Sequence, residues 1–310
     1  MSSRALLPVM VTATALVLTG CAAPADGADG DPAGLRIVAS TNVYGDIAAT
    51  IAGDAADVTS IIRDAAQDPH DYEATPRDAL ALADADLVIV NGGGYDAFMG
   101  TLLDAHGGDA VVLDAVELAG LDMGAGHDDH DHGDHDHAVN EHVWYDLHVI
   151  EHLAEELAQQ LSALDPANSE SFAANAAAFV DGVGALEAAA SGISVAHAGA
   201  RVAITEPVPL YLLEAAGLED ATPAAFSEAI EEGADAPVLV LRDVVTLVSD
   251  GSVAFLAYNA QTVGPQTEEV LAAARGAGTP VVSFSELLPE GEDYLGWMAS
   301  NLAAIEAALA

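Results

Sequence analysis

Short apolar runs rich in β-branched residues alternate with Ala-rich helical stretches along most of the chain, and this alternation constrains the fold more than any other feature. The seven runs are Leu35–Ala39, Val58–Ile62, Leu87–Val90, Val111–Leu113, Arg201–Thr205, Val253–Tyr258 and Val281–Phe284. Strands separated by helical connections form parallel sheets with helices over their faces. Because one long helical stretch divides the runs into two sets, the sequence predicts two α/β lobes.

The dividing stretch reads as a single helix. It begins at Asp165, which suits the N-cap, and Pro166 occupies the first helical position. Apolar residues then recur at spacings of four and three, at Phe172, Ala176, Phe179, Val183, Leu186 and Ala190. Such a stripe is typical of a helix that buries one side. Gly192 is the expected end of this helix.

These boundaries predict an N-terminal lobe at residues 35–164, a rigid linker helix at 165–192 and a C-terminal lobe at 193–310. Within the second lobe, Ala236–Ser249 is ambiguous between helix and strand by pattern, and its length favours a helix. The predicted fold class is therefore α/β, with two parallel sheets joined by one long helix.

The N-terminus has the features of an exported lipoprotein. Arg4 precedes an apolar run, Ala5–Leu18, which is too short to span a bilayer comfortably and ends in a lipobox, Leu-Thr-Gly-Cys21. We expect residues 1–20 to be a cleaved signal peptide, Cys21 to carry the lipid and residues 21–34 to be a flexible spacer. The alternative is an ordinary signal peptide in which Cys21 is incidental. Since Cys21 is the only cysteine, any metal site must use His and carboxylates.

The charge balance excludes some partners. The chain has 50 Asp and Glu against 7 Lys and Arg, and its formal net charge is −43. Nucleic acid and anionic lipid are poor partners for such a surface. A negative field favours cations in general, but it selects no particular one.

A His-rich tract, residues 126–137, is the densest concentration of metal-binding side chains. Its histidines are His127, His130, His132, His135 and His137. Imidazole suits zinc, copper and nickel, but a loop without a scaffold binds metal weakly and with changing ligands. We interpret the tract as an auxiliary collector of metal; the alternative is a polar loop with no role.

Four other residues occupy positions suited to a fixed site. His70 follows the strand that ends at Ile62, His142 opens the phrase HVWYD, Glu206 follows the strand Arg201–Thr205, and Glu286 comes two residues after Phe284. Open α/β sheets present their binding crevices beyond the carboxyl ends of strands. Any one of these residues alone is more often a solvated surface side chain, but their shared location at strand ends favours a metal site.

At these residues the sequence resembles the solute-binding proteins of zinc and manganese ABC importers, the ZnuA-like and TroA-like family. The resemblance rests on DPHDYEATPRDALALADADLVIVNG, NEHVWYDLHVIEHLAEEL, TEPVPLYLLEAAGL, YNAQT and VVSFSELLPEGEDYLGWM, and it covers essentially the whole mature chain. It implies two lobes joined by a rigid helix, with one ion held in the cleft between the lobes by two ligands from each lobe: His70, His142, Glu206 and Glu286. In relatives, the third position is often His in zinc binders and Glu in manganese binders, and the fourth is commonly Asp.

The resemblance implies a function in metal import. We expect an extracytoplasmic lipoprotein, monomeric and held on the outer face of the cell membrane, that delivers a divalent ion to an ABC permease and its ATPase. Zinc is favoured because zinc binders of this family carry a His-rich insertion between the first two ligands; manganese or iron is the alternative, because two carboxylates make a harder site.

Two readings of another kind stay open. His148, Glu151 and His152 spell the H-x-x-E-H pattern of a zinc metallopeptidase, which is not expected because five-residue patterns arise by chance in a His-rich region. The other reading is a surface metal buffer or adhesion protein without a transporter. The favoured prediction is a binding protein and not an enzyme.

Overall fold

The computed structural model describes residues 34–310 apart from 65–66, 68, 71 and 122–139. The expected signal peptide, Cys21 and the histidines of the 126–137 tract lie outside the described residues, so the predictions about them stay predictions. Residues 34–310 form one compact unit by their contacts, and it contains both predicted sheets.

The first sheet is parallel, with the strand order β2-β1-β3-β4. Its strands are β1 (Leu35–Thr41), β2 (Ala56–Ile62), β3 (Leu87–Val90) and β4 (Val111–Asp114). The helical elements of this region are α1 (Asn42–Ala52), η1 (Gly53–Ala55), α2 (Pro76–Ala83), α3 (Ala97–His106) and α4 (Ala115–Leu118). All four residues of β3 are buried, as expected for a parallel strand that is covered on both faces.

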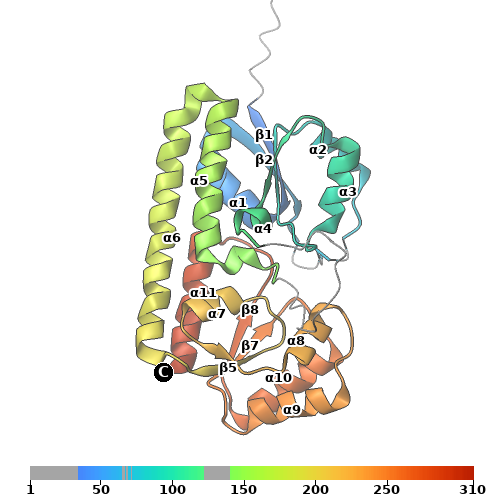
Figure 1. Cartoon of the computed structure of the whole chain (residues 1–310), viewed down its shortest axis with the longest axis vertical. Helices are drawn as coiled ribbons and strands as arrows, with labels where there is room; N and C mark the ends of the chain where they lie inside the picture. The colour runs from blue at the N-terminus through green and yellow to red at the C-terminus, as the bar shows by residue number, and fades with distance from the viewer. Residues whose placement is uncertain (1–33, 65–66, 68, 71, 122–139) are drawn as a thin grey trace, which may run out of the picture. The chain divides into compact units, whose positions relative to one another are not determined.

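The second sheet is also parallel, with the order β6-β5-β7-β8; β5, β7 and β8 are labelled in Figure 1. Its strands are β5 (Arg201–Ile204), β6 (Glu219–Asp220), β7 (Leu256–Asn259) and β8 (Val281–Phe284). The helices that accompany it are α7 (Leu210–Ala215), α8 (Ala224–Glu231), α9 (Val238–Ser249) and α10 (Pro265–Ala277). The helix predicted within Ala236–Ser249 is confirmed as α9. The sequence did not predict β6, because its two residues are acidic and exposed.

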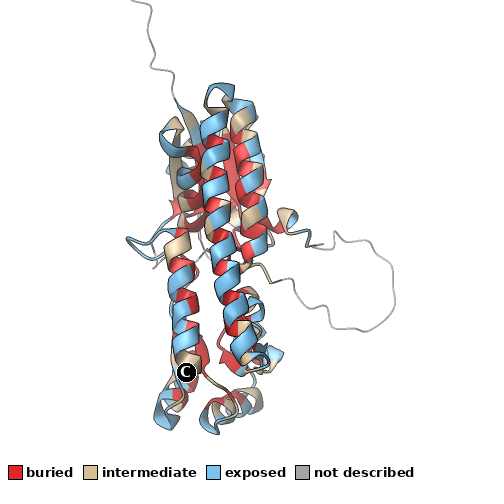
Figure 2. Ribbon diagram, turned by 90° about the vertical axis from the view of Figure 1, so that its left-hand side faces the viewer, coloured by how far each residue is buried: buried red, intermediate tan, exposed pale blue. Residues whose placement is uncertain are grey.

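Long helices run beside the two sheets: α5 (Leu147–Leu164), α6 (Ser169–His197) and α11 (Tyr294–Leu309), with the short turns η2 (Val143–Tyr145) and η3 (Pro166–Asn168). Figure 1 shows α6 alongside both α5 and α11. Figure 2 shows exposed residues along the outward side of these helices and buried residues on the strands behind them. The α/β class with a long connecting helix is therefore confirmed.

The predicted stripe of α6 is confirmed, but the predicted end of the helix is wrong. Phe172, Phe179 and the other four stripe residues are buried, and Ile193 extends the stripe by one more position. Burial of the Ile193 side chain stabilises a further turn, so the helix continues past Gly192 to His197. Gly199, with φ 74°, adopts the left-handed conformation that lets the chain turn away. By length and composition, Pro166–His197 could also cross a membrane, but such a helix is weak evidence for a span.

The C-terminal segment contacts α1 and η2 and joins the two halves of the protein. Asn42 donates from its side-chain amide to the carbonyl of Leu288 (2.8 Å) and accepts from the amide of Leu288 (3.0 Å). Tyr294 donates from its backbone amide to Asp46 (2.8 Å) and from its hydroxyl to the carbonyl of Trp144 (2.7 Å). One cluster of buried apolar side chains continues from β1 and β3 through α5 and α6 to β5 and β7. The arrangement resists a large opening between the sheets.

Candidate metal centre

His142 presents a buried lone pair. It immediately precedes η2, and its side chain is 1% exposed. Its Nδ1 lies 2.7 Å from Oδ1 of Asn140, whose amide orientation is fixed because its Nδ2 donates to the carbonyl of Pro207 (3.1 Å). Nδ1–H is therefore the donor, and Nε2 carries the lone pair. Burial lowers the pKa of His142 to about 4, so the imidazole stays neutral. Among the described residues, Nε2 has no hydrogen-bond partner.

The segment that carries His142 is held from two directions. Asn91, which directly follows β3, donates to the carbonyl of Glu141 (2.9 Å). Tyr211, on α7, donates from its hydroxyl to the carbonyl of Asn140 (2.7 Å). Since both hydrogen bonds are to backbone carbonyls next to His142, they fix the position of its imidazole in the site.

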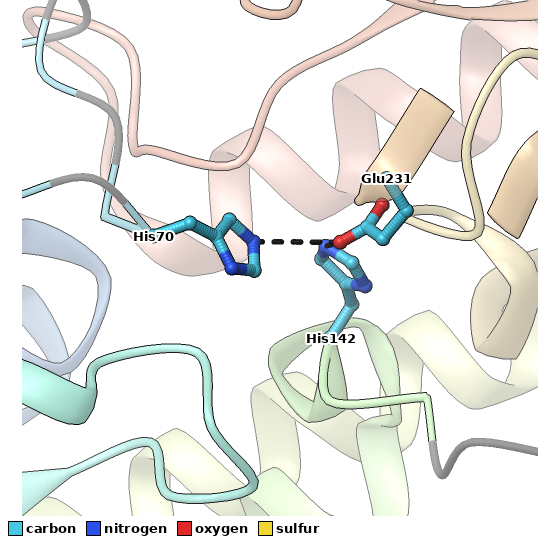
Figure 3. Close-up of side chains that lie close together, drawn as sticks. All are labelled: His70, His142 and Glu231. Atoms are coloured by element: carbon cyan, nitrogen blue, oxygen red, sulfur yellow. Dashed lines mark ion pairs between the residues drawn. The ribbon is translucent and has the colours of Figure 1, made fainter. Parts of the chain in front are cut away.

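His70 and Glu231 meet His142 at the same point (Figure 3). Oε1 of Glu231, the last residue of α8, lies 3.4 Å from Nε2 of His70 and 3.4 Å from Nε2 of His142. One ligand atom from each of the three residues lies within 4.8 Å of the other two. His70 comes from the loop after β2, so the three side chains reach this point from three separate segments of the chain.

The charges at this point support one another. Burial lowers the pKa of His70, but its hydrogen bond to Glu231 and the charges of Glu231, Glu286 and Glu141 raise it more, to about 9. Burial raises the pKa of Glu231, but the opposing effect of His142 and His70 is larger, so the pKa of Glu231 is lowered. Without a metal ion, His70 is therefore a cation, stabilised by the carboxylates of Glu231, Glu286 and Glu141.

Glu206 and Glu286 stand at the ends of the second sheet, as predicted. Glu206 follows β5 and Glu286 follows β8, and the side-chain amide of Asn259, at the end of β7, donates to both carboxylates. The Asn259–Glu286 distance is 2.8 Å. Tyr95 donates to the other oxygen of Glu286 (3.2 Å). The two carboxylates are 2% and 6% exposed, and burial raises the pKa of Glu206 to about 8.

A cavity of about 340 Å³ joins these groups. Its lining includes His70, Glu206, Glu231 and Glu286, together with Ile230, Glu232, Gly233 and Thr262. The structure thus brings His70 and His142 together with Glu231, and it places Glu206 and Glu286 on the wall of the same cavity. The compact three-residue cluster itself contains neither Glu206 nor Glu286.

Aromatic rings back the two imidazoles. The Tyr95 ring lies 5.0 Å from His70 and 5.8 Å from His142, centroid to centroid, and the Trp144 ring lies 5.0 Å from His142. Tyr95 and Trp144 are buried and contact each other at 4.6 Å. Edge-to-face contacts of this kind restrict ring rotation, so the imidazoles are held before any ion arrives.

The sequence interpretation missed Glu231. It lies outside the phrases that carry the family resemblance, and no pattern of spacing connects it to His70 or His142. One signal was available: Glu231 is the last residue of α8, Glu232 is its C-cap, and the last turn has no basic residue. Acidic residues are unfavourable at the negative end of a helix dipole, so their presence there points to a local cation.

Comparison with known families identifies the group to which these features belong. The model of the family described as "Zinc-uptake complex component A periplasmic", ZnuA, matches residues 37–308. The chain belongs to the ZnuA family. This assignment bears out the resemblance that the sequence motifs carry.

Curated relatives of this chain differ in the metals for which they are named. The manganese-binding lipoprotein MntA of Halalkalibacterium halodurans is 30% identical over 57% of this chain and 56% of its own length. The zinc-binding lipoprotein AdcA of Streptococcus pneumoniae is 28% identical over 96% of this chain and 60% of its own length. The chain therefore spans between half and two thirds of these curated relatives. Neither is named as an enzyme, and the metallopeptidase reading of His148, Glu151 and His152 is not supported.

Solved structures share the fold. The periplasmic zinc-binding protein TroA from Treponema pallidum superposes with a TM-score of 0.72 at 19% identity, over 89% of this chain and 99% of that one. At this identity the likeness concerns the fold alone.

Proposed function

We propose that this chain is the solute-binding component of an ABC importer, which captures one divalent transition-metal ion outside the cytoplasm and delivers it to a permease driven by an ATPase. Membership of the ZnuA family supports the general role. The observation that carries the proposal is the lone pair on the buried Nε2 of His142, which faces His70 and Glu231. A buried polar atom without a partner is costly, and a metal ion would satisfy it.

The proposed ligands are His70, His142, Glu206 and Glu286, and Glu231 joins them. Two ligand atoms that each lie about 2.1 Å from an ion, at a tetrahedral angle, are about 3.4 Å apart. This is the separation between Oε1 of Glu231 and each imidazole Nε2. The carboxylates of Glu206 and Glu286 would complete the coordination from the second sheet, since both line the same cavity.

Zinc is the favoured ion, with manganese or iron as the alternative. Two imidazoles and a carboxylate suit zinc, whereas each added carboxylate oxygen raises the relative affinity for manganese. Glu206 is expected to decide the preference because it adds a hard, charged donor. Replacement by His should strengthen zinc relative to manganese, and Glu206→Ala should weaken both. Competition binding of the two ions to both variants tests this, and unchanged affinities in Glu206→Ala would remove Glu206 from the ligand set.

Capture of the ion is tested by calorimetry on the purified protein. His142→Ala should lose the tight zinc equivalent, and the matched control His106→Ala, which removes an exposed histidine at the end of α3, should keep it. One tight equivalent remaining in His142→Ala would contradict the proposed site.

Delivery and location need a cellular test. Deletion of the gene should lower zinc uptake at low external zinc, and the parent gene should restore uptake while the His142→Ala gene should not. Lipidation of Cys21 is expected to hold the protein, as a monomer, on the outer face of the membrane. Cys21→Ala should release it, and a fractionation that finds the variant still bound to the membrane would argue against the anchor.

A further inference from the structure

A second group of metal-ligating side chains lies on α5, away from the cavity. His148, Glu151 and His152 occupy positions i, i+3 and i+4 of the helix, so they share one face. The Nε2 atoms of His148 and His152 are 3.2 Å apart, and the two rings lie 4.5 Å apart at 74°. Nδ1 of His148 lies 3.8 Å from Oε2 of Glu151. The pattern that suggested a peptidase is therefore a real spatial cluster.

The neighbouring helix α6 adds a fourth group. A ring nitrogen of His148 and one carboxylate oxygen each of Glu151 and Glu187 lie within 4.8 Å of one another. Glu187 belongs to α6, and its side chain faces α5 at this height. The His148 side chain is 70% exposed, so solvent reaches the group directly. None of the four residues lines the cavity described above.

We propose that His148, His152, Glu151 and Glu187 form a second, surface site for one divalent transition-metal ion between α5 and α6. Two imidazole nitrogens at about 2.0–2.1 Å from an ion and 3.2 Å from each other subtend about 100° at that ion, between the octahedral and tetrahedral angles. Glu151, which is half-buried and lies beside Nδ1 of His148, and the exposed Glu187 have to change rotamer to reach an ion bound at the Nε2 atoms. Because both helices are rigid, the site is partly formed before the ion binds.

The chemistry selects among cations. The 3.2 Å contact fits an Nε2–H of one ring that donates to the Nε2 of the other. For an ion to bind both Nε2 lone pairs, that proton has to pass through solvent to the Nδ1 of its own ring, so that both imidazoles stay neutral with their proton on Nδ1. Two imidazoles on adjacent turns of a helix suit zinc, copper and nickel, whereas manganese and magnesium prefer oxygen ligands. Two carboxylates balance the charge of the ion. The site therefore selects imidazole-preferring ions, whatever metal the cavity carries.

The test follows individual rings in the full mature chain labelled with ¹⁵N-histidine. The rings of His148 and His152 are assigned by their disappearance in His148→Ala and His152→Ala, and Zn²⁺ is titrated in. Both rings should shift together and saturate with one ion, beyond the equivalent taken by the cavity. Glu187→Gln should weaken this step by about tenfold or more, since loss of even an indirect partner of a metal commonly costs 10–100-fold. His106→Ala is the matched control and should change nothing.

Three outcomes would overturn the proposal. The first is that the His152 ring keeps its full zinc-induced shift, at the same concentrations, in His148→Ala. The second is that the two rings titrate at different zinc concentrations in the parent, and the third is that Glu187→Gln leaves the affinity unchanged. The exposed positions of both histidines favour folded variants, and equal thermal midpoints in the absence of zinc check this. Mn²⁺ at the same concentration should leave both rings unbroadened, and equal binding of Mn²⁺ would contradict the selectivity.

Discussion

Replacement of Glu231 by Gln should lower the pKa of His70 in the metal-free protein. The carboxylate of Glu231 lies 3.4 Å from Nε2 of His70, and it is the main group that raises the pKa of this imidazole from 6.5 to about 9. An opposite charge at this range typically moves a pKa by about 1–3. Burial, which lowers the pKa of His70, remains in the variant, while Glu286 and Glu141 still raise it. We therefore expect a partial fall toward the ordinary value.

The same change has a calculable effect on stability. A tenfold change in proton affinity corresponds to about 1.4 kcal/mol, so the rise to about 9 represents on the order of 3 kcal/mol, of which Glu231 supplies a large part. Since the folded protein binds this proton more tightly than the unfolded chain does, the stabilisation is complete below pH 6.5 and is lost as the pH rises through about 9. Glu231→Gln should therefore lower the free energy of unfolding at pH 6 by about 2 kcal/mol, and by little above pH 10.

The assay is an NMR titration of His70 in the metal-free protein, with thermal unfolding measured at pH 6 and pH 10. Glu228→Gln is the matched control, because Glu228 lies on the same helix but is exposed and does not line the cavity. A pKa of His70 that stays near 9 in Glu231→Gln would refute the reasoning, and so would an equal fall in Glu228→Gln.

Four further predictions concern the orientation of His142, the proton on Glu206, the His-rich tract and the motion between the two sheets. Asn140→Ala removes the acceptor that fixes the tautomer of His142, so calorimetry should show zinc binding about 10–100-fold weaker, and an unchanged affinity would mean that Asn140 does not orient the ring. The folded protein also binds the Glu206 proton more tightly than the unfolded chain does, so the metal-free protein should lose stability as the pH rises from about 4.5 to about 8. Zinc should then raise the thermal midpoint more at pH 8 than at pH 5. The reverse order would contradict the proposal that Glu206 is a metal ligand. Deletion of residues 126–137 should remove weak metal equivalents and spare the tight one, as counted by calorimetry; loss of the tight one would place the specific ligands in that tract. Scattering curves of metal-free and loaded protein should differ little, because α6 and the Asn42–Leu288 contacts resist hinge opening, and a large difference would contradict this.

Local patterns in the amino-acid sequence were enough to predict the class of fold and the elements that could carry a site. The apolar stripe of α6 and the alternation of buried strands with helices are local patterns, so they can be predicted from the spacing of apolar residues. Local rules also placed Glu206 and Glu286 beyond β5 and β8, since parallel strands end at a common edge. Even here a local signal failed where a long-range contact competed with it, because burial of Ile193 carried α6 past Gly192 to His197.

Which side chains meet depends on how distant segments of the chain pack together. His70, His142 and Glu231 come from a loop after β2, a loop before α5 and the end of α8, and no periodicity relates positions so distant in the chain. The lone pair on His142 depends on the amide of Asn140, which is itself oriented by the carbonyl of Pro207. The spacing of His148 and His152 on one helix was visible in the sequence, but the approach of His148 to Glu187 required α5 to lie against α6. A site built from several segments depends on how those segments pack. Their packing is set by the whole core and not by any one stretch of residues.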